Sequence, residues 1–499
     1  MFKIIFSLAI LFSTTTYSQK PNYKEKHRPQ FHFSPPAHWM NDPNGMVYYK
    51  GEYHLFYQYY PDSTVWGPMH WGHAISKDLV HWQHLPIALY PDSLGLIFSG
   101  SVVVDKNNTS GLQEGDEKPL VALFTYHDLK KERAGIETDF QYQGMAYSQD
   151  KGRTWKKYKH NPVIKNNGIK DFRDPKVFWH EASKHWVMVL AVADRVDFYR
   201  SDNLKEWKYT GTFGKQEGSH GGVWECPDLI EMKTDGNQTK WVLIVSIGKG
   251  GPNGGSATQY FVGNFDGENF TNSNNKETVL WLDYGPDDYA GVTWSNTGNQ
   301  KLFLGWMSNW DYAQQVPTKN WRSAMTLPRE LSLKKTDKGY RLFSAPSKAL
   351  QALRTSTQIL NGKNNLFSGL YEAELEFDTQ NETTGELGVS FSNAKNETIK
   401  IGFDKSANEF YIDRSRAGST SFSPSFTKRS AAKRISTNST VRLHVFIDHS
   451  SVELFADGGS VSMTAVFFPS GVLSKAMVYN NGGKAKVQKA VLHQLKSIW

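Results

Sequence analysis

The sequence has a single cysteine, Cys226, and this scarcity excludes an internal disulfide framework and any cysteine-based zinc or iron–sulfur site. It lacks a dense run of lysine or arginine. The 57 basic and 49 acidic residues leave a net charge of +8, so we expect no nucleic-acid partner. Disorder is excluded by 29 Phe, 23 Tyr and 16 Trp residues. These aromatics beside 41 Gly favour a β-rich protein that stacks on a flat ligand, such as a sugar ring.

The first residues are typical of a secretory signal peptide. A short basic start precedes the apolar run Ile4 to Phe12, and Thr16 and Ser18 are small residues before a predicted cleavage. The pattern predicts a signal peptide over 1–18 and an exported protein, periplasmic or extracellular. The apolar run is too short to span a bilayer, and a lipid anchor would need a cysteine at the new N-terminus, so no membrane anchor is expected. Residues 19–30 are polar and carry proline, which predicts a flexible lead.

One strand pattern recurs five times between residues 31 and 343. Five similar apolar runs are spaced by 68, 65, 55 and 61 residues, as their central residues Leu55, Leu123, Met188, Leu243 and Leu304 show. In three of the units a polar turn follows and ends in a tryptophan: Ser76 to Trp82, Ser148 to Trp155 and Ser201 to Trp207. Five β units of this length predict a five-bladed β-propeller over 31–343. Unrelated strands in a large sandwich are the alternative.

The pattern changes after residue 343. The polar segment 344–358 predicts a linker or a short helix, and strands in 359–499 then alternate polar and apolar residues, as in Tyr371 to Phe377. Such alternation gives each strand one wet and one buried face, which is typical of a two-sheet sandwich. The expected fold class is therefore all-β, a five-bladed β-propeller followed by a C-terminal β-sandwich that supports the first domain.

Three acidic motifs lie in three different units of the propeller region. They are Trp-Met-Asn-Asp-Pro-Asn-Gly around Asp42, Phe-Arg-Asp-Pro around Asp174 and Trp-Glu-Cys-Pro-Asp around Glu225. The first two also fit ordinary turns, because Asp and Pro are common turn residues. The third differs, since Glu225 stands between a tryptophan and the lone cysteine. Apolar surroundings favour the protonated carboxyl that a general acid needs near neutral pH.

A propeller would bring these acids together, because the innermost strand of every blade faces the central channel. Cleavage of a glycoside needs one carboxylic acid to protonate the departing oxygen and one carboxylate to attack or shield the sugar carbon. Aromatic residues near the same strand ends would form the walls for a sugar ring, namely Trp39, Trp66, Phe98 and Trp306. The spacing of His70, His73 and His220 matches no metal-ligand set, so neither a metal nor a cofactor is expected.

Taken in order, these motifs resemble glycoside hydrolase family 32, the β-fructosidases, which include invertases, inulinases and levanases. The likeness covers nearly the whole chain after the signal peptide and includes a sandwich motif at 448–458. The longer sequence segments around Glu225 and at 283–290 resemble bacterial levanases and exo-inulinases more closely than intracellular sucrose hydrolases. Further matching segments are Gln58 to Pro61, Trp66 to Pro68, Phe98 to Gly100, Gly305 to Trp310 and Pro317 to Ser323.

The resemblance implies a role for each acid. Asp42 would be the nucleophile that forms a fructosyl ester, and Glu225 would be the acid that protonates the leaving group and then the base that activates water. Asp174, kept ionised by Arg173, would stabilise the transition state. Cys226 is expected to be structural packing beside the acid. The terminal fructose would be bound by Asn41, Gln58, Trp66, Phe98, Ser99, Arg173 and Trp306.

The implied protein is an exported retaining hydrolase that releases fructose from the non-reducing ends of fructans (levan, inulin) and from sucrose. Retention implies a gap of about 5–5.5 Å between the two catalytic carboxyls. The alternatives are a sucrose-specific invertase, an endo-levanase, a fructosyl transferase, an inverting five-bladed enzyme for arabinose or xylose polymers, and a non-catalytic sugar-binding protein. The sequence leaves linkage preference, exo or endo action and oligomeric state open.

Overall fold

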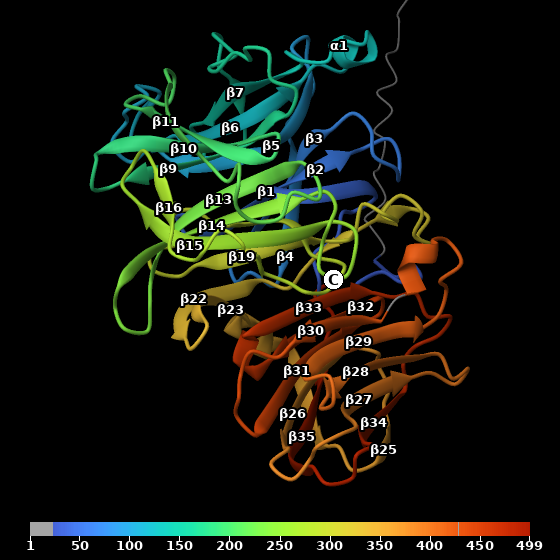
Figure 1. Ribbon diagram of the computed structural model, residues 1–499. Helices are drawn as coiled ribbons and strands as arrows, with labels where there is room; N and C mark the ends of the chain where they lie inside the picture. The colour runs from blue at the N-terminus through green and yellow to red at the C-terminus, as the bar shows by residue number, and fades with distance from the viewer. Residues whose placement is uncertain (1–22, 428) are drawn as a thin grey trace, which may run out of the picture.

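The computed structural model describes residues 23–427 and 429–499 (Figure 1). The predicted signal peptide, 1–18, and the start of the predicted lead lie outside the described residues. Regular structure in the described part is almost entirely β, and the one α-helix there is the five-residue α1 (Leu129–Arg133). Three short 3-10 helices accompany the strands, η1 (Lys348–Leu353), η2 (Pro424–Thr427) and η3 (Asp457–Gly459).

The first two sheets of the N-terminal part are consecutive along the chain. The first consists of β1 (His38–Tyr49), β2 (Glu52–Tyr60), β3 (His70–Ser76) and β4 (Trp82–Leu89), with β20 (Trp321–Arg322) parallel to β1. The second consists of β5 (Leu96–Val104), β6 (Leu120–His127), β7 (Gln141–Ser148) and β8 (Lys156–Lys157).

Three further sheets repeat the same antiparallel order. The third consists of β9 (Phe172–His180), β10 (His185–Val192), β11 (Arg195–Ser201) and β12 (Lys208–Phe213). The fourth consists of β13 (Trp224–Lys233), β14 (Thr239–Ile247), β15 (Ala257–Phe265), β16 (Phe270–Asn272) and β17 (Leu280–Trp281). The fifth consists of β18 (Tyr289–Thr293), β19 (Leu302–Met307), β21 (Ala324–Met325), β22 (Arg329–Thr336) and β23 (Gly339–Pro346).

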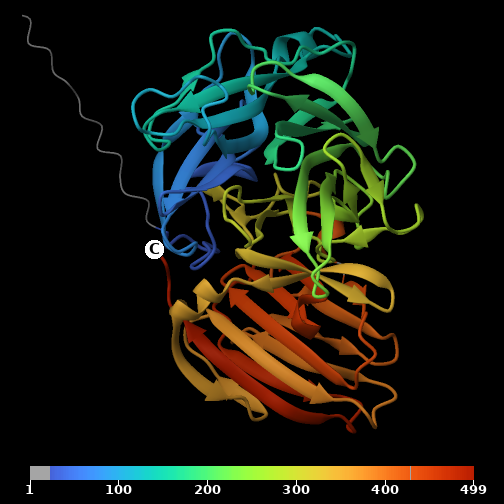
Figure 2. The ribbon, with the colours of Figure 1, turned by 90° about the vertical axis from the view of Figure 1, so that its left-hand side faces the viewer.

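The five sheets form a closed ring, so the predicted five-bladed propeller is confirmed. The first strand of each blade (β1, β5, β9, β13 and β18) contacts the first strand of the next, and β18 contacts β1. Figure 2 shows the blades arranged around a common centre above the second domain. The five apolar runs seen in the sequence form the second strands, which are covered on both faces and therefore carry continuous apolar residues.

The recurrent polar turns join the outer strands of the first three blades. In each turn the hydroxyl of a serine that ends one strand bonds to an Asp or Asn two residues later, at 3.0 Å for Ser76 and Asp78 and 2.7 Å for Ser148 and Asp150. The third blade repeats this with Ser201. The side chain at the second position also accepts backbone N–H groups, so the turn supplies its own hydrogen bonds.

The C-terminal part is a sandwich of two six-stranded sheets. One sheet has the order β24 (Arg354–Ile359), β35 (Lys486–Leu495), β26 (Tyr371–Asp378), β31 (Thr440–Asp448), β32 (Ser451–Ala456), β33 (Val461–Val466). The other has the order β25 (Lys363–Asn365), β34 (Lys475–Asn480), β27 (Glu386–Ser392), β28 (Thr398–Asp404), β29 (Glu409–Arg416), β30 (Ser430–Lys433). Apolar residues at alternate positions fill the space between the sheets.

The segment 344–358, predicted as a linker or a short helix, holds the short helix η1 between the end of β23 and the start of β24. Residues 23–30, predicted as a flexible lead, are packed. Tyr23 stacks on Trp499 with ring centroids 3.9 Å apart, and the fully buried Arg28 donates to the Pro35 carbonyl at 2.6 Å. The composition of this segment is polar, but its aromatic and guanidinium groups find partners far along the chain.

Buried charges join the two domains. Arg329 of the propeller donates to Glu453 of the sandwich at 2.6 Å and to Asp283 at 2.9 Å, and all three side chains are fully buried. His32, held between Asp448 and Glu453, has its pKa raised to about 9 by these carboxylates against the cost of burial.

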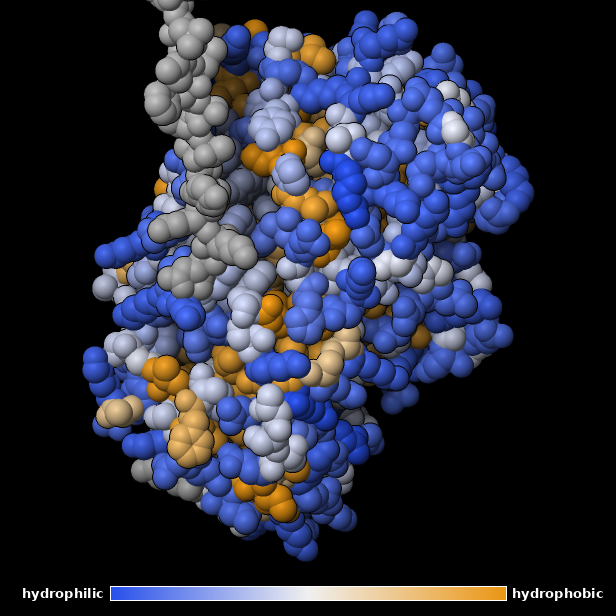
Figure 3. All heavy atoms as spheres, turned by 180° about the vertical axis from the view of Figure 1, so that it is seen from behind, coloured by the Kyte–Doolittle hydropathy of each residue, from blue (hydrophilic) through white to orange (hydrophobic). Residues whose placement is uncertain are grey.

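Most side chains on the face of the molecule seen in Figure 3 are hydrophilic. Within 23–427 and 429–499, no helix has the length and apolar character to cross a membrane.

Candidate active site

A β-bulge interrupts the innermost strand of all five blades at the same level of the channel. At each bulge two residues of the inner strand lie opposite one residue of the second strand, as the pairing register shows. Bulges redirect side chains, and these ones carry the predicted site residues into the mouth of the channel. The bulged pairs are Asn41 and Asp42 on β1, Phe98 and Ser99 on β5, Asp174 and Pro175 on β9, Cys226 and Pro227 on β13, and Ala290 and Gly291 on β18.

Three of the bulges hold a non-glycine residue in the left-handed region. The backbone φ is 65° at Asp174, 47° at Cys226 and 53° at Ala290. Such conformations cost about 1–3 kcal/mol each and persist where the surrounding structure fixes them. The ring of blades stores this strain at the site.

Asp42 is held by two side-chain donors. Asn41 donates to Oδ1 at 2.9 Å and Ser99 donates to Oδ2 at 2.8 Å, while Asn41 is itself fixed by the Trp39 indole N–H at 2.7 Å. Burial and the charge of Glu225 raise the pKa of Asp42 above its ordinary value, and the bonds from Asn41 and Ser99 oppose the rise. The carboxyl is thus fixed in direction while one side faces the cavity.

Glu225 lies between a guanidinium and a phenol. Arg173 donates to its Oε1 from Nε and Nη2, both at 3.2 Å, and Tyr289 donates to its Oε2. Burial, followed by the Glu225 charge, raises the pKa of Tyr289 well above 10, so the phenol stays a donor. The apolar surroundings expected for Glu225 are therefore wrong, because its neighbours in sequence, Trp224 and Cys226, point to other partners.

Asp174 is the most enclosed of the three acids, with 6% of its surface exposed. It accepts the Cys226 backbone N–H at 3.0 Å, and burial raises its pKa to about 7, which Arg173 opposes and the charges of Glu225 and Asp42 reinforce. The charge of Arg173 favours the ionised form of Asp174, as expected, but the hydrogen bonds of Arg173 run to Asp171, Glu225 and Gln141. Geometry explains the difference, because the bulge turns Asp174 toward Cys226.

One thiol marks the point where the acids meet. Cys226 Sγ lies 3.6 Å from Asp42 Oδ2 and 3.6 Å from Asp174 Oδ2, and Glu225 is the preceding residue. Burial and the three nearby carboxylates raise the pKa of the Cys226 thiol, so it stays protonated and acts as a weak donor toward both acids. Acids that are 132 and 51 residues apart in sequence therefore occupy one site.

The acids open into a cavity of about 360 Å³ at this mouth of the channel. The volume lies in the range of about 300–1,000 Å³ typical of small-molecule sites. Six of the seven predicted binding residues line it, namely Asn41, Gln58, Trp66, Phe98, Ser99 and Arg173. Trp66 and Phe98 form one wall, with an edge-to-face contact at 6.1 Å. Gln58 is 2% exposed, and its Nε2 has no hydrogen-bond partner among the described residues.

Trp306, the seventh, does not line the cavity. It is fully buried on β19, donates to the Met40 carbonyl at 3.1 Å and packs beneath Trp310 with ring centroids 4.9 Å apart. Trp310 and Gln314, from the loop after β19, reach the cavity instead. The predicted sugar contact of Trp306 is therefore wrong, because the strand points its indole into the core below the site.

Several other lining residues were not predicted from the sequence. The stretch from the end of β6 to the start of β9 supplies a second wall, from His127, Glu132, Phe140, Gln141, Lys170 and Asp171. His127 stacks on Phe98 at 4.3 Å and bonds to Glu132 of α1 at 3.0 Å. These residues belong to no short motif, so only the folded chain brings them together.

One cluster in the described residues has the spacing of a metal site, and it lies in the sandwich. Glu372, Glu374 and His444 place ligand atoms within 4.8 Å of one another. Their oxygens already accept from Arg354 at 2.5 and 3.0 Å, and Glu374 also accepts from Lys489. This cluster is therefore a network of ion pairs distant from the three acids.

Comparison with known proteins identifies the family. The description "Glycosyl hydrolases family 32 N-terminal domain" matches residues 32–346, and "Glycosyl hydrolases family 32 C terminal" matches residues 341–494. The chain belongs to glycosyl hydrolase family 32. It is 49% identical to a levanase of Bacillus subtilis over all of this chain and 74% of that protein. It is 39% identical to an extracellular exo-inulinase of Aspergillus niger over 96% of each.

Solved structures agree with this membership. An exo-inulinase from Aspergillus awamori superposes with a TM-score of 0.88 at 35% identity, over 96% of this chain and 100% of that one. A β-fructofuranosidase from Schwanniomyces occidentalis, complexed with fructosyl-erythritol, superposes with a TM-score of 0.84 at 33% identity, over 95% and 98%. The predicted resemblance is thus confirmed, and this family 32 member is a glycoside hydrolase.

Proposed function

We propose that this family 32 enzyme is an exported β-fructosidase that releases fructose from the non-reducing ends of fructans and from sucrose. The observation that carries the proposal is the convergence of Asp42, Asp174 and Glu225 around one buried thiol, at the base of a cavity with aromatic and amide walls. The relatives named levanase and exo-inulinase support fructan as the substrate class.

In the first half of the reaction, Asp42 attacks the anomeric carbon of the terminal fructose. Its carboxylate forms the new C–O bond while the bond to the leaving sugar breaks, and the Glu225 carboxyl gives its proton to the departing oxygen. The bonds from Asn41 and Ser99 aim Asp42, and Tyr289 with Arg173 aims Glu225. Such fixed geometry lowers the entropic cost of reaching the transition state.

In the second half, Glu225 acts as a base. Its carboxylate takes a proton from water, the resulting hydroxide oxygen attacks the anomeric carbon, and the ester bond to Asp42 breaks. Two inversions give overall retention. This double displacement needs a gap of about 5–5.5 Å between the two carboxyls, whereas an inverting enzyme holds about 6.5–9.5 Å to admit water.

Asp174 is assigned to transition-state stabilisation. Its pKa of about 7 reflects burial and the charges of Glu225 and Asp42. Sugar hydroxyls that donate to Asp174 would favour its ionised form, and the carboxylate would then stabilise positive charge on the sugar ring. Gln58 offers a free amide N–H to the same sugar, and Trp66, Phe98 and Trp310 offer apolar faces.

Export of the enzyme fits a fructan substrate, because a polymer must be cut outside the cytoplasm. The N-terminal sequence and the extracellular location in the relatives' names support it. No cofactor enters the proposed reaction.

The decisive assay incubates the purified protein with levan, inulin and sucrose and resolves the products by chain length. Fructose as the sole early product from both polymers is expected. A ladder of oligomers would replace exo by endo action, action on sucrose alone would indicate an invertase, and longer products would indicate transfer. No release from any of the three substrates would overturn the proposal.

A further inference from the structure

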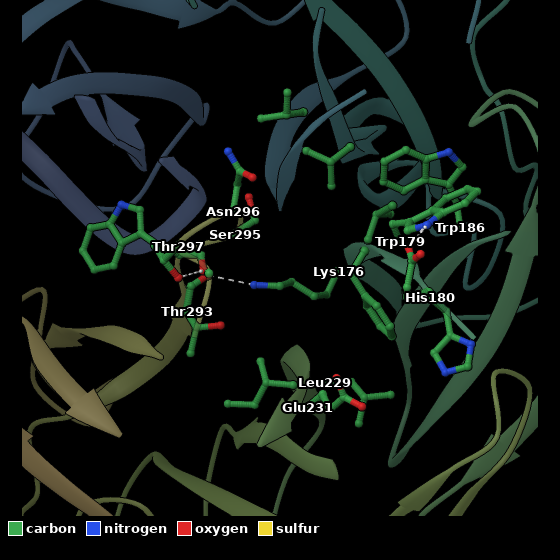
Figure 4. A pocket seen from close by; sticks show the side chains of 18 of the residues that line it. Lys176, Trp179, His180, Trp186, Leu229, Glu231, Thr293, Ser295, Asn296 and Thr297 are labelled. Atoms are coloured by element: carbon green, nitrogen blue, oxygen red, sulfur yellow. Dashed lines mark hydrogen bonds between the residues drawn. The ribbon is translucent and has the colours of Figure 1, made fainter. Parts of the chain in front are cut away.

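The opposite mouth of the propeller channel holds a second cavity, of about 520 Å³, which the proposed reaction does not use. It is lined by the far ends of four inner strands, β5, β9, β13 and β18, and by the loop after β18 (Figure 4). We propose that this cavity is a second binding site for a neutral sugar, separate from the catalytic one.

A buried polar layer separates the two cavities. Each inner strand contributes one residue to it, one or two positions after its bulged pair, and each of these is at most 7% exposed: Asn44, Ser101, Lys176, Asp228 and Thr293. Lys176 donates to Asp228 at 3.0 Å and to the Thr293 carbonyl at 2.8 Å, which closes the layer. A ligand in the second cavity therefore does not reach the catalytic acids.

The two sides of this cavity differ in character. Figure 4 shows Lys176 extending between Trp179 and Trp186 on one side and the segment from Thr293 to Thr297 on the other. The two indoles pack edge to face at 5.3 Å, and Val177, Leu229 and Trp241 continue this apolar wall. The opposite side carries the hydroxyl and amide groups of the segment from Thr293 to Thr297 beside the Trp294 indole, and their donors already bond within the protein. A sugar ring presents an apolar C–H face and a rim of hydroxyls, so it fits a cavity with one wall of each kind.

Unpaired charges of both signs indicate a neutral ligand. The Lys301 ammonium is mostly buried, and its pKa is lowered by burial against the effect of Asp228 and Glu231. Neither Lys301 nor the exposed Lys106 and Glu231 has a side-chain hydrogen bond or ion pair among the described residues. Glu231 would repel an anion and Lys301 would repel a cation, whereas each sugar hydroxyl can donate to one and accept from the other.

The site binds but does not cleave, because the described part of the chain places no second acid beside Glu231. Glu181, the other carboxylate in the lining, is exposed and pairs with Lys184. Retaining and inverting hydrolysis both need two carboxyl groups flanking one bond.

The test measures binding of inulotriose, a three-unit fructose oligomer, by calorimetry in an Asp42→Asn background that blocks cleavage. Two binding events are expected, and adding Lys301→Met should weaken one of them by about tenfold or more while the other is unchanged. The matched control is Lys208→Met, an exposed lysine on the outer strand β12, which should alter neither event. With Asp42 intact, Lys301→Met should leave sucrose turnover unchanged.

A single event, or a second event that Lys301→Met leaves intact, would overturn the second site. Inorganic phosphate serves as the anion probe. Phosphate binding that needs Lys301 and tightens in Glu231→Gln would replace the sugar by an anion and overturn the ligand class. Failure of the proposed function would show as an absence of turnover in the unmodified protein. Failure of the second site would show in the binding experiment, so the two outcomes can be told apart.

Discussion

Replacing Asp174 with asparagine should stabilise the folded protein at pH 8 while it removes activity. Burial raises the pKa of Asp174 from 3.8 to about 7, so the folded state holds this proton more tightly than the unfolded chain does. The stabilising contribution is complete below pH 3.8 and is lost as the pH rises through 7. A shift of about three units corresponds to ~4 kcal/mol at 1.36 kcal/mol per unit, which is an upper bound for the gain.

The assay is thermal unfolding of the Asp174→Asn variant and the unmodified protein at pH 4 and pH 8. Asparagine keeps the shape and an oxygen that accepts the Cys226 N–H. The variant should unfold a few degrees higher at pH 8, and the gap should shrink at pH 4, where Asp174 is protonated. Asp337→Asn, on the exposed turn between β22 and β23, is the control and should change neither value. A variant less stable than the unmodified protein at pH 8, or an equal gap at both pH values, would refute the reasoning.

Three further predictions concern turnover and binding. Asp42→Asn and Glu225→Gln should each lower kcat by several orders of magnitude with an unchanged circular dichroism spectrum, and near-normal turnover in either would contradict their roles. The pH–rate profile should be a bell whose acid limb lies above pH 3.8, because burial raises the pKa of Asp42, and a monotonic profile would count against the pair. Trp310→Ala should raise KM for sucrose, whereas Trp306→Phe should mainly lower the unfolding temperature; the reverse pattern would place Trp306 in the pocket.

The propeller could be predicted from the sequence because each blade repeats the same buried second strand. Leu55 and Leu304 mark the first and last of these runs, and the turns of the first three blades recur because a serine and an Asp or Asn two residues later close the same loop. These patterns are local, so they can be recognised without knowing which strands pair with each other. The sandwich was visible for a similar reason, since alternation along single strands shows one buried face.

The positions of side chains at the site were harder to predict because they depend on register. A bulge is visible only when two strands are paired, and the bulges decide that Asp174 turns toward Cys226 and that Arg173 bonds to Glu225. Strand direction likewise sends Trp306 into the core and leaves the cavity to Trp310. Motifs therefore indicated which residues gather, while the partners of each residue required the folded chain.

The measurement that tests the account most directly is the configuration of the first-formed product. Sucrose hydrolysis followed by NMR from the first seconds distinguishes the anomers of the released fructose before they interconvert. Attack by Asp42 followed by water activated at Glu225 predicts that β-fructofuranose appears first. Initial release of the α-anomer would mean direct attack by water, and Asp42 would then not be the nucleophile.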